Sequence, residues 1–436
     1  MTYDIIIGRD LADKERFGDK GLIHIGKGYV KMGNYTSLSN KIYMDIARSH
    51  VVLVAGKRGS GKSYTLGVIA EELSNLQSDT AQNIASLIFD TMGIFWTMKF
   101  KNEKEKILLE EWGFETKSLP VKIFVPFGKV EYYKEKNIPV DATFAIKISE
   151  LEAEDWITLF NLSLTSLPAV LIQRVVSDLK DKIINFTLED IQMLIEHDRK
   201  ASKETKEIVS SLFLAADTWG IFSKTKEGIE ISDLITAGAT TILDTSIYSS
   251  IGPFNIRALV ISLVSRKLFK SRLDARKREE LEAIRHGQEY LSYNERREEP
   301  LVWIFIDEAQ EFLPRDAQTP ATEALKQLLR EGRQPGISLV LATQQPGQIH
   351  KDVMTQSDIV ISHRVTSKLD TKALNDIMQT YLLENIKQQM DDLPSLKGSA
   401  IILDDNSERL YPMRVRPRFT WHGGEAPVAI KTEIQI

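Results

Sequence analysis

The segment with the clearest chemical meaning is GKRGSGKS, residues 56–63, which fits the pattern G-x-x-x-x-G-K-[ST] at every fixed position. Glycines let successive backbone N–H groups turn toward phosphate oxygens, while Lys62 offers an ammonium to the β- and γ-phosphates and Ser63 a hydroxyl to Mg²⁺. An apolar β-branched run precedes the segment and a helical pattern follows it, as a phosphate-binding loop (P-loop) requires. The sequence therefore predicts bound ATP and Mg²⁺, with nucleotide contacts from Gly56, Lys57, Arg58, Gly59, Ser60, Gly61, Lys62, Ser63 and Tyr64.

Two adjacent carboxylates end another apolar run, LVWIFIDEAQEFLP, residues 301–314. Asp307 lies at the expected tip of this strand, where it is predicted to hold Mg²⁺ through the water shell of the ion, together with Ser63. Glu308 is predicted to orient and deprotonate the water that attacks the nucleotide. Such pairs also occur as ordinary strand ends, but a P-loop in the same chain favours ATP hydrolysis.

A third apolar run, GISLVLATQQPGQI, residues 336–349, also ends in polar side chains. Gln344 is predicted to sense the γ-phosphate or the attacking water by a hydrogen bond, and the alternative is a polar strand end without a role. A helical pattern with Pro320 in its first turn precedes this run and ends near Arg330 and Arg333. Arg333 either satisfies the last helix carbonyls or reaches a neighbouring subunit's nucleotide as an arginine finger; residue types alone leave both open.

Short apolar runs alternate with helical stretches, which predicts an α/β fold with a mainly parallel sheet covered on both faces. Ligands bind at the carboxyl ends of such strands, where Asp90, Asp244 and Asp307 fall. Asp90 is either an acid that supports the metal site or a strand terminator. The other predicted strands are residues 84–90, 121–126, 240–246, 358–365 and 399–404.

The 436 residues divide into five expected parts. We expect a short N-terminal β-rich assembly region at 1–45, an ATPase domain in two parts at 46–148 and 226–404, a helical subdomain inserted at 149–225, and a C-terminal tail at 405–436. The inserted part carries amphipathic helix patterns with little strand signal, and its aromatic residues are typical of a core rather than of a ligand cage.

Composition narrows the class of protein. The chain has no cysteine, which excludes disulfides and thiolate metal sites. It shows neither a signal peptide nor an apolar run long enough to cross a bilayer, so we expect a cytoplasmic protein without a membrane partner. A net charge of −5 argues against a surface coated for nucleic acid, although a narrow basic channel in a ring would barely change this total.

The P-loop, FIDEAQEFLP, LLREGRQPGISLVLATQQP, VMTQSDIVISHRV and RVRPRFTWHGGEAP together resemble the HerA branch of the HerA–FtsK ATPases. The resemblance implies a RecA-like P-loop fold of the ASCE type, a homo-hexameric ring, double-stranded DNA moved through its pore, and commonly a nuclease partner. It implies a trans-acting role for Arg333 and a tail, with Arg414, Arg416 and Arg418, that braces the adjacent subunit. Two features depart from the family pattern: only about 45 residues precede the P-loop strand, and Gln345 stands where the family often has arginine.

The sequence therefore predicts an ATP-hydrolysing ring motor that translocates double-stranded DNA, with a nuclease or another effector as partner. The alternative keeps the ATPase but makes the ring a nucleotide-gated scaffold that regulates an effector enzyme, for example in phage defence. A protein-unfolding ring is less favoured, because the sequence has no clear aromatic-hydrophobic pore loop.

Overall fold

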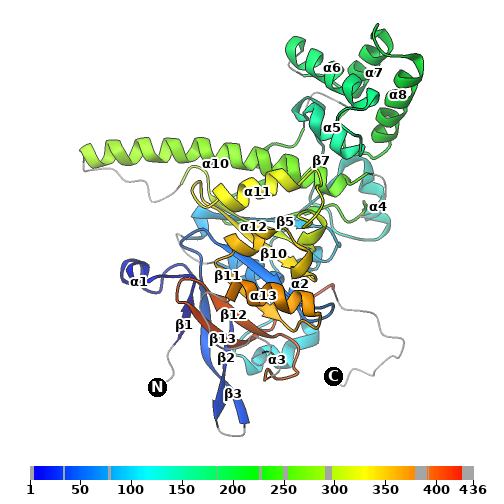
Figure 1. Ribbon diagram of the computed structural model, residues 1–436. Coiled ribbons are helices and arrows are strands. Elements are labelled where there is room, and N and C mark those ends of the chain that lie inside the picture. Colours follow the sequence, from blue (N-terminus) through cyan, green and yellow to red (C-terminus); the bar gives the residue numbers. More distant parts are fainter. Residues whose placement is uncertain are drawn as a thin grey trace.

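The strands of the computed structural model form one 13-stranded sheet in the order β1-β3-β2-β13-β12-β11-β4-β10-β9-β5-β8-β6-β7. The section from β11 to β7 is parallel throughout, while β11, β12, β13, β2 and β3 join one another by antiparallel pairs. The predicted mainly parallel α/β sheet is thus confirmed (Figure 1). The structure describes residues 4–32, 35–76, 80–183, 185–224, 228–248, 254–289, 297–378, 390 and 392–424.

The parallel section carries the predicted apolar runs. Two predicted strands, 84–90 and 399–404, have the predicted bounds, and the others differ by one or two residues at their ends. The strands of this section are β4 (Val51–Ala55), β5 (Ile84–Asp90), β6 (Lys122–Pro126), β7 (Ala142–Phe144), β8 (Thr240–Asp244), β9 (Leu301–Ile306), β10 (Ile337–Thr343) and β11 (Ile359–His363).

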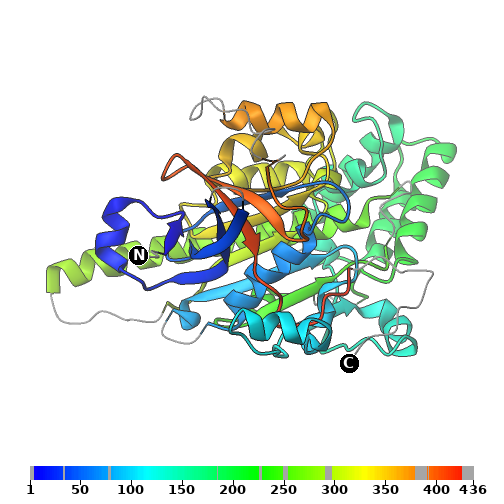
Figure 2. The same ribbon diagram turned by 90° about the horizontal axis from the view of Figure 1, so that it is seen from below.

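Helices cover both faces of the sheet because successive side chains of a strand point to opposite faces. Val52 and Val54 of β4 pack in one core with α2 (Lys62–Ser74), while Val51 and Leu53 pack in the other. The second core includes α10 (Ile256–Glu289), α11 (Thr322–Glu331), α12 (Lys351–Gln356) and α13 (Lys368–Met378). The C-terminal part of α10 extends away from the sheet (Figures 1 and 2).

The N-terminal strands belong to the same sheet. β2 (Leu22–Met32) pairs with β13 (Arg409–Val415), which pairs with β12 (Ser399–Asp404), so segments from the two ends of the chain lie side by side. The other elements of this N-terminal region are β1 (Ile5–Ile7), α1 (Leu11–Phe17) and β3 (Tyr35–Asp45).

Four helices, α5 (Ala153–Leu159), α6 (Leu167–Lys182), α7 (Leu188–His197) and α8 (Lys203–Asp217), form a group that projects from the rest of the molecule (Figure 1). Trp156 of α5 is buried and contacts the rings of Phe160, Phe213 and Phe222, which confirms that these aromatic residues form a core.

The remaining short elements are α3 (Lys106–Glu111), α4 (Val130–Glu135), α9 (Ile231–Leu234), and the 3-10 turns η1 (Ala81–Asn83), η2 (Phe95–Lys99), η3 (Glu103–Glu105), η4 (Phe127–Lys129), η5 (Ile148–Glu150), η6 (Ala309–Glu311) and η7 (Pro346–Gln348).

Candidate functional site

The P-loop connects β4 to α2 at the carboxyl edge of the sheet. α2 begins at Lys62, directly after Gly61, whose φ of 111° is a left-handed conformation that favours glycine. A side chain at Gly56 would place a Cβ 2.5 Å from Ser60 Oγ and 2.7 Å from the Cβ of His363, so the loop closes tightly here. The two glycines therefore permit the sharp turn that aims the start of α2 at the inside of the loop.

Two side chains of the loop have unused capacity to bind an anion. The hydroxyl of Ser60 is buried and has no hydrogen-bond partner among the described residues. Lys62 is buried, and its Nζ donates to the backbone carbonyl of Lys57 at 3.3 Å. Burial lowers the pKa of Lys62, whereas the charges of Glu308 and Asp307 act in the opposite direction. A phosphate group would satisfy both the hydroxyl and the ammonium, so the residues present fit a nucleotide.

Asp307 follows β9 and meets the P-loop. Its Oδ2 accepts a short hydrogen bond from the Ser63 hydroxyl, and its Oδ1 accepts from the backbone N–H of Glu308 at 2.9 Å. Burial raises the pKa of Asp307, and the bond from Ser63 opposes this shift. Within the described residues no group of three or more His, Cys, Asp or Glu could hold a metal ion. Mg²⁺ bound beside phosphates needs only one or two protein oxygens, so Ser63 and Asp307 fit it.

Glu308 lies in a left-handed backbone conformation, with φ of 52° and ψ of 44°, at the turn after β9. One of its carboxylate oxygens accepts a short hydrogen bond from the Gln344 amide, and the other accepts from Gln310 Nε2 at 2.7 Å. The Oε1 of Gln310 in turn accepts from the Thr343 hydroxyl at 2.8 Å. β9 and β10 are neighbours, so the structure brings Glu308 and Gln344 together beside Ser63 and Asp307.

Arg333 lies elsewhere. α11 ends at Glu331, and Arg333 follows in the turn before β10, where its Nη2 lies 3.1 Å from both Asp358 Oδ1 and the carbonyl of Gln356. Asp358 also accepts from the backbone N–H of Val51, at the amino end of β4. The length of β4, about 16 Å for five residues, therefore separates Arg333 from the P-loop of its own chain. The side chain of Arg333 is 49% exposed. The sequence prediction for Pro320 was wrong by a short distance, because Pro320 lies just before α11 rather than in its first turn.

Other side chains at this edge were not singled out from the sequence. His363, at the end of β11, lies beneath the loop; its Nε2 is 2.8 Å from the Thr65 hydroxyl, and burial lowers its pKa to about 4. Arg257 is buried beside the Glu308 turn, with Nη1 3.7 Å from Glu311 Oε2 and Nε without a hydrogen-bond partner among the described residues. A polar residue at the end of an apolar strand was the available signal for His363, whereas the pairing of Arg257 depends on tertiary contacts.

Asp90 anchors a loop. Its two carboxylate oxygens accept hydrogen bonds from the backbone N–H groups of residues 92–95 at 2.7–3.2 Å. Burial and the neighbouring charge of Asp244 raise the pKa of Asp90 to about 7. Of the two sequence interpretations, the structure supports the strand terminator.

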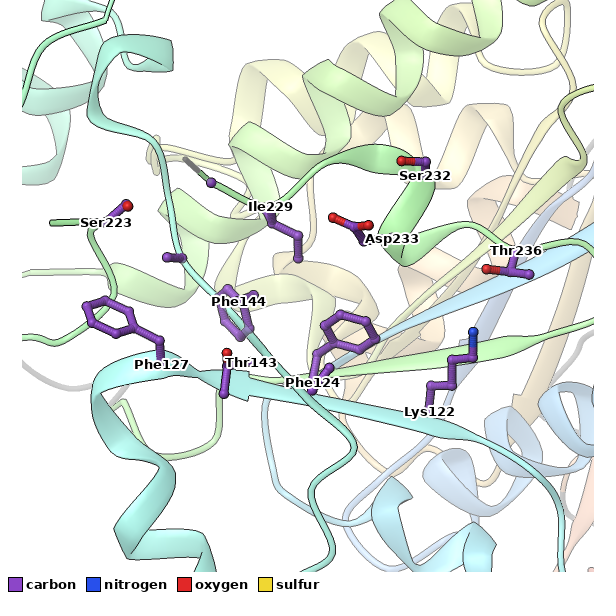
Figure 3. Close-up of a pocket in the computed structure, with 13 residues that line it drawn as sticks. Lys122, Phe124, Phe127, Thr143, Phe144, Ser223, Ile229, Ser232, Asp233 and Thr236 are labelled. Atoms are coloured by element: carbon purple, nitrogen blue, oxygen red, sulfur yellow. The ribbon is translucent and has the colours of Figure 1, made fainter. Parts of the chain in front are cut away.

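A cavity of about 580 Å³ lies away from these residues, between β6, β7 and the α9 region (Figure 3). Its wall carries three aromatic rings, from Phe124, Phe127 and Phe144, with Lys122 and Asp233 beside them. No residue predicted to bind or hydrolyse the nucleotide lines it.

The C-terminal segment folds back onto α2 of its own chain. Glu71, on α2, accepts hydrogen bonds from Arg416 Nη1 at 3.3 Å, from Arg418 Nε at 2.9 Å and from the backbone N–H of Phe419 at 2.9 Å. Arg416 and Arg418 are fully buried in these contacts, so their side chains are held within one chain. Residues 425–436 of the predicted tail lie outside the described residues, and a contact of the tail with an adjacent subunit remains a prediction.

Comparison with known proteins places the chain in a family. The family model described as "Helicase HerA, central domain" matches residues 23–268, which is more than half of the chain, and the model for Zonular occludens toxin (Zot) matches residues 266–373. The chain is 28% identical over 149 residues to the DNA double-strand break repair helicase HerA of Pyrococcus furiosus, across 32% of this chain and 24% of that protein. It is 23% identical over 385 residues to the probable helicase MJ1565 of Methanocaldococcus jannaschii, across 87% of this chain and 65% of that protein.

The matched regions thus span less than two thirds of the length of these relatives. Among solved structures, VirB4 of Thermoanaerobacter pseudethanolicus has a TM-score of 0.55 at 12% identity, covering 92% of this chain and 97% of that chain, which shows a shared fold. Within the part of the chain that the structure describes, no helix is long and apolar enough to span a membrane. The match over residues 23–268 and the shared fold show that the chain belongs to the HerA helicase family, as a HerA-type ATPase with a RecA-like P-loop fold.

Proposed function

We propose that this protein hydrolyses ATP as part of a homo-hexameric ring and uses the energy to translocate double-stranded DNA. The observation that carries the proposal is the convergence of Ser63, Asp307, Glu308 and Gln344 beside a P-loop with unused anion-binding capacity. The P-loop binds the phosphates, and Ser63 and Asp307 are the proposed Mg²⁺ residues. Bound Mg²⁺ would neutralise charge on the β- and γ-phosphates.

Glu308 is the proposed general base. Both of its carboxylate oxygens accept hydrogen bonds from side-chain amides, which hold the carboxylate in one position from which it can take a proton from water. Gln344 contacts this carboxylate from the neighbouring strand, so a change at the γ-phosphate that moves Gln344 would also move the base.

The position of Arg333 supports the proposed ring. Arg333 lies at the edge of the sheet opposite the P-loop of its own chain, which supports the proposed role in trans. DNA as the substrate is supported by the family and by the names of the curated relatives. We further propose that a nuclease or another effector protein works with the ring.

A DNA-dependent ATPase assay tests this function. Duplex DNA of any sequence should stimulate hydrolysis, and DNA affinity should fall steeply between low and physiological salt, because backbone contacts release counterions. Glu308→Gln should retain ATP binding and lose turnover, whereas Lys62→Ala should weaken ATP binding itself. The absence of any duplex affinity at low salt, with an ATP analogue present, would contradict the DNA motor and favour the nucleotide-gated scaffold.

A further inference from the structure

The side chain of Arg333 is held at one corner by its own chain. Its Nη2 lies 3.1 Å from Asp358 Oδ1 and donates to the carbonyl of Gln356 at 3.1 Å. The carboxylate of Asp358 is buried, whereas the Arg333 side chain is half-exposed. A guanidinium is planar and carries five N–H groups, so a contact at Nη2 leaves those of Nη1 and Nε for a second acceptor.

Asp358 is itself fixed by three contacts. Its Oδ1 accepts from the backbone N–H of Val51 at 2.8 Å, and its Oδ2 lies 2.7 Å from His50 Nδ1. The backbone N–H of Asp358 also donates to the carbonyl of Val51 at 3.1 Å. Buried, charge-assisted contacts of this kind hold their geometry well, so the carboxylate provides a fixed point for the guanidinium.

His50 is positively charged in this arrangement. Its Nε2 lies 3.1 Å from Asp45 Oδ2, so both ring nitrogens face carboxylate oxygens, and both donate only when the ring is protonated. Asp45, at the end of β3, is balanced on its other side by Arg9, whose Nε donates to Oδ1 at 2.8 Å. Charges therefore alternate in sign from Arg9 through Asp45, His50 and Asp358 to Arg333.

Stability alone does not account for the last pair in this series. A half-exposed ion pair usually adds little to the free energy of unfolding. A finger that acts on a neighbouring nucleotide gains more, because a free arginine side chain loses many rotamers when it binds a phosphate. The contact with Asp358 restricts the rotamers of Arg333 in advance and keeps its remaining N–H groups available.

We propose that Asp358, itself fixed by the charged His50, is a positioning residue that orients Arg333 toward the nucleotide of the adjacent subunit. The inference rests on the proposed trans role of Arg333 and adds the residues that prepare the finger in the chain that donates it. Neither Asp358 nor His50 touches the nucleotide, and both act through Arg333.

Two variants weaken this orientation, and a third is a matched control. Asp358→Asn keeps the shape of the side chain and removes its charge, while His50→Gln keeps an N–H donor and removes the charge of the ring. Asp352→Asn removes a similar buried carboxylate, which accepts from Arg330 Nε at 2.7 Å between α11 and α12. For each full-length protein, ATPase assays measure kcat, and titration calorimetry measures the dissociation constant of a non-hydrolysable ATP analogue.

We expect Asp358→Asn to lower kcat by about 10-fold to 100-fold, as the loss of a charged contact should, while the dissociation constant stays within about twofold. His50→Gln should lower kcat by about threefold, and Asp352→Asn should leave it unchanged. In an Arg333→Ala background, Asp358→Asn should cause no further loss, because its effect passes through Arg333.

Mixed rings assign the defect to one side of the subunit interface. An Asp358→Asn subunit has an intact Glu308, so a Glu308→Gln neighbour that supplies an oriented Arg333 should raise the activity above the mean of the two separate proteins. A mixture of Asp358→Asn with Arg333→Ala should stay at that mean, because neither chain supplies an oriented finger.

An unchanged kcat in Asp358→Asn would overturn the inference. A further loss in the Arg333→Ala background, or recovery with Arg333→Ala instead of Glu308→Gln, would overturn it as well, because the defect would then lie outside the finger. If Asp358→Asn does not fold, the same comparisons with His50→Gln decide. If Glu308→Gln and Arg333→Ala do not complement each other, the trans role itself is wrong, which is a different and recognisable outcome.

Discussion

At the scale of single residues, the carboxylate of Glu308 is held from both sides. Gln310 comes from the same turn, and Gln344 comes from the end of the neighbouring strand. The backbone of Glu308 is left-handed, which is a costly conformation for a residue with a side chain. This conformation directs the carboxylate between the two amides. We infer that the position of the carboxylate depends on the amide from β10.

Gln344→Ala should therefore lower the turnover number by about 100-fold while the dissociation constant for ATP changes little, because the phosphate contacts of the P-loop remain. Steady-state ATPase assays with parallel binding titrations measure both quantities. Gln345→Ala removes the exposed neighbouring amide and should leave both unchanged. A Gln344→Ala enzyme with normal turnover would make Gln344 a polar strand end only.

His50 gives the protein a stability that depends on pH. Burial alone would lower its pKa, but hydrogen bonds to Asp358 at 2.7 Å and Asp45 at 3.1 Å raise it to about 9 from an ordinary 6.5. The folded state holds the proton of His50 more tightly than the unfolded state does. The contribution of this proton to the free energy of unfolding is therefore complete below pH 6.5 and is lost as the pH rises through 9.

We expect the free energy of unfolding to fall between pH 6.5 and 9 by up to about 3 kcal/mol more in the parent protein than in His50→Gln. Urea unfolding at a series of pH values measures the difference in slope. His197→Gln, at an exposed position, should retain the parent slope. Parallel curves for the parent and His50→Gln would contradict the assignment of the proton to His50.

At the scale of elements, α2 carries a glycine where helix propensity disfavours one. A Cβ at Gly67 would lie 2.5 Å from the Cζ of Arg418, which is buried and bonded to Glu71. The gap left by Gly67 thus admits the guanidinium that joins the C-terminal segment to the P-loop helix.

Gly67→Ala should lower the free energy of unfolding by about 1–2 kcal/mol, since overpacking against Arg418 outweighs the gain of about 1 kcal/mol in helix propensity. Gly287→Ala in α10 is the opposite case, because nothing lies within 4 Å of its added Cβ, and it should raise stability. Denaturant unfolding of the two variants should therefore give changes of opposite sign. Stabilisation by Gly67→Ala would mean that Arg418 moves aside freely.

The elements that have a local signal in the sequence could be predicted. β5 and β12 were predicted to the residue because apolar runs bounded by polar residues define buried strands. The cis contacts of Arg416 and Arg418 with Glu71 could not be predicted, because the sequence does not tell which chain a basic segment will contact. The support of Glu308 by Gln310 was missed for a related reason: it depends on the left-handed turn after β9.

At the scale of the whole molecule, the P-loop and Arg333 lie at opposite edges of the sheet. The P-loop lies at the carboxyl edge, and Arg333 lies at the amino edge, paired with Asp358. A site that needs both must therefore be built from two chains. In that arrangement a lone subunit would be a poor ATPase, even with its P-loop intact.

Mixing two inactive proteins tests this arrangement. Glu308→Gln and Arg333→Ala should each lose about 10³-fold or more in rate, and mixed rings should recover part of it. Recovery is expected because a subunit with an intact Glu308 can receive Arg333 from a Glu308→Gln neighbour. Native mass spectrometry should first verify that subunits have exchanged. Verified mixed rings without activity would contradict the trans role of Arg333.

The strand order also governs when the ATP site can form during synthesis. The P-loop strand β4 is inserted between β10 and β11, which leave the ribosome much later. At about 5–20 residues per second, roughly 15–60 s separate the translation of Ser63 from that of His363. Throughout this interval the apolar β4 lacks its partners on both sides, so the nascent chain should need chaperone protection, and a prematurely terminated chain would have no working site with which to consume ATP.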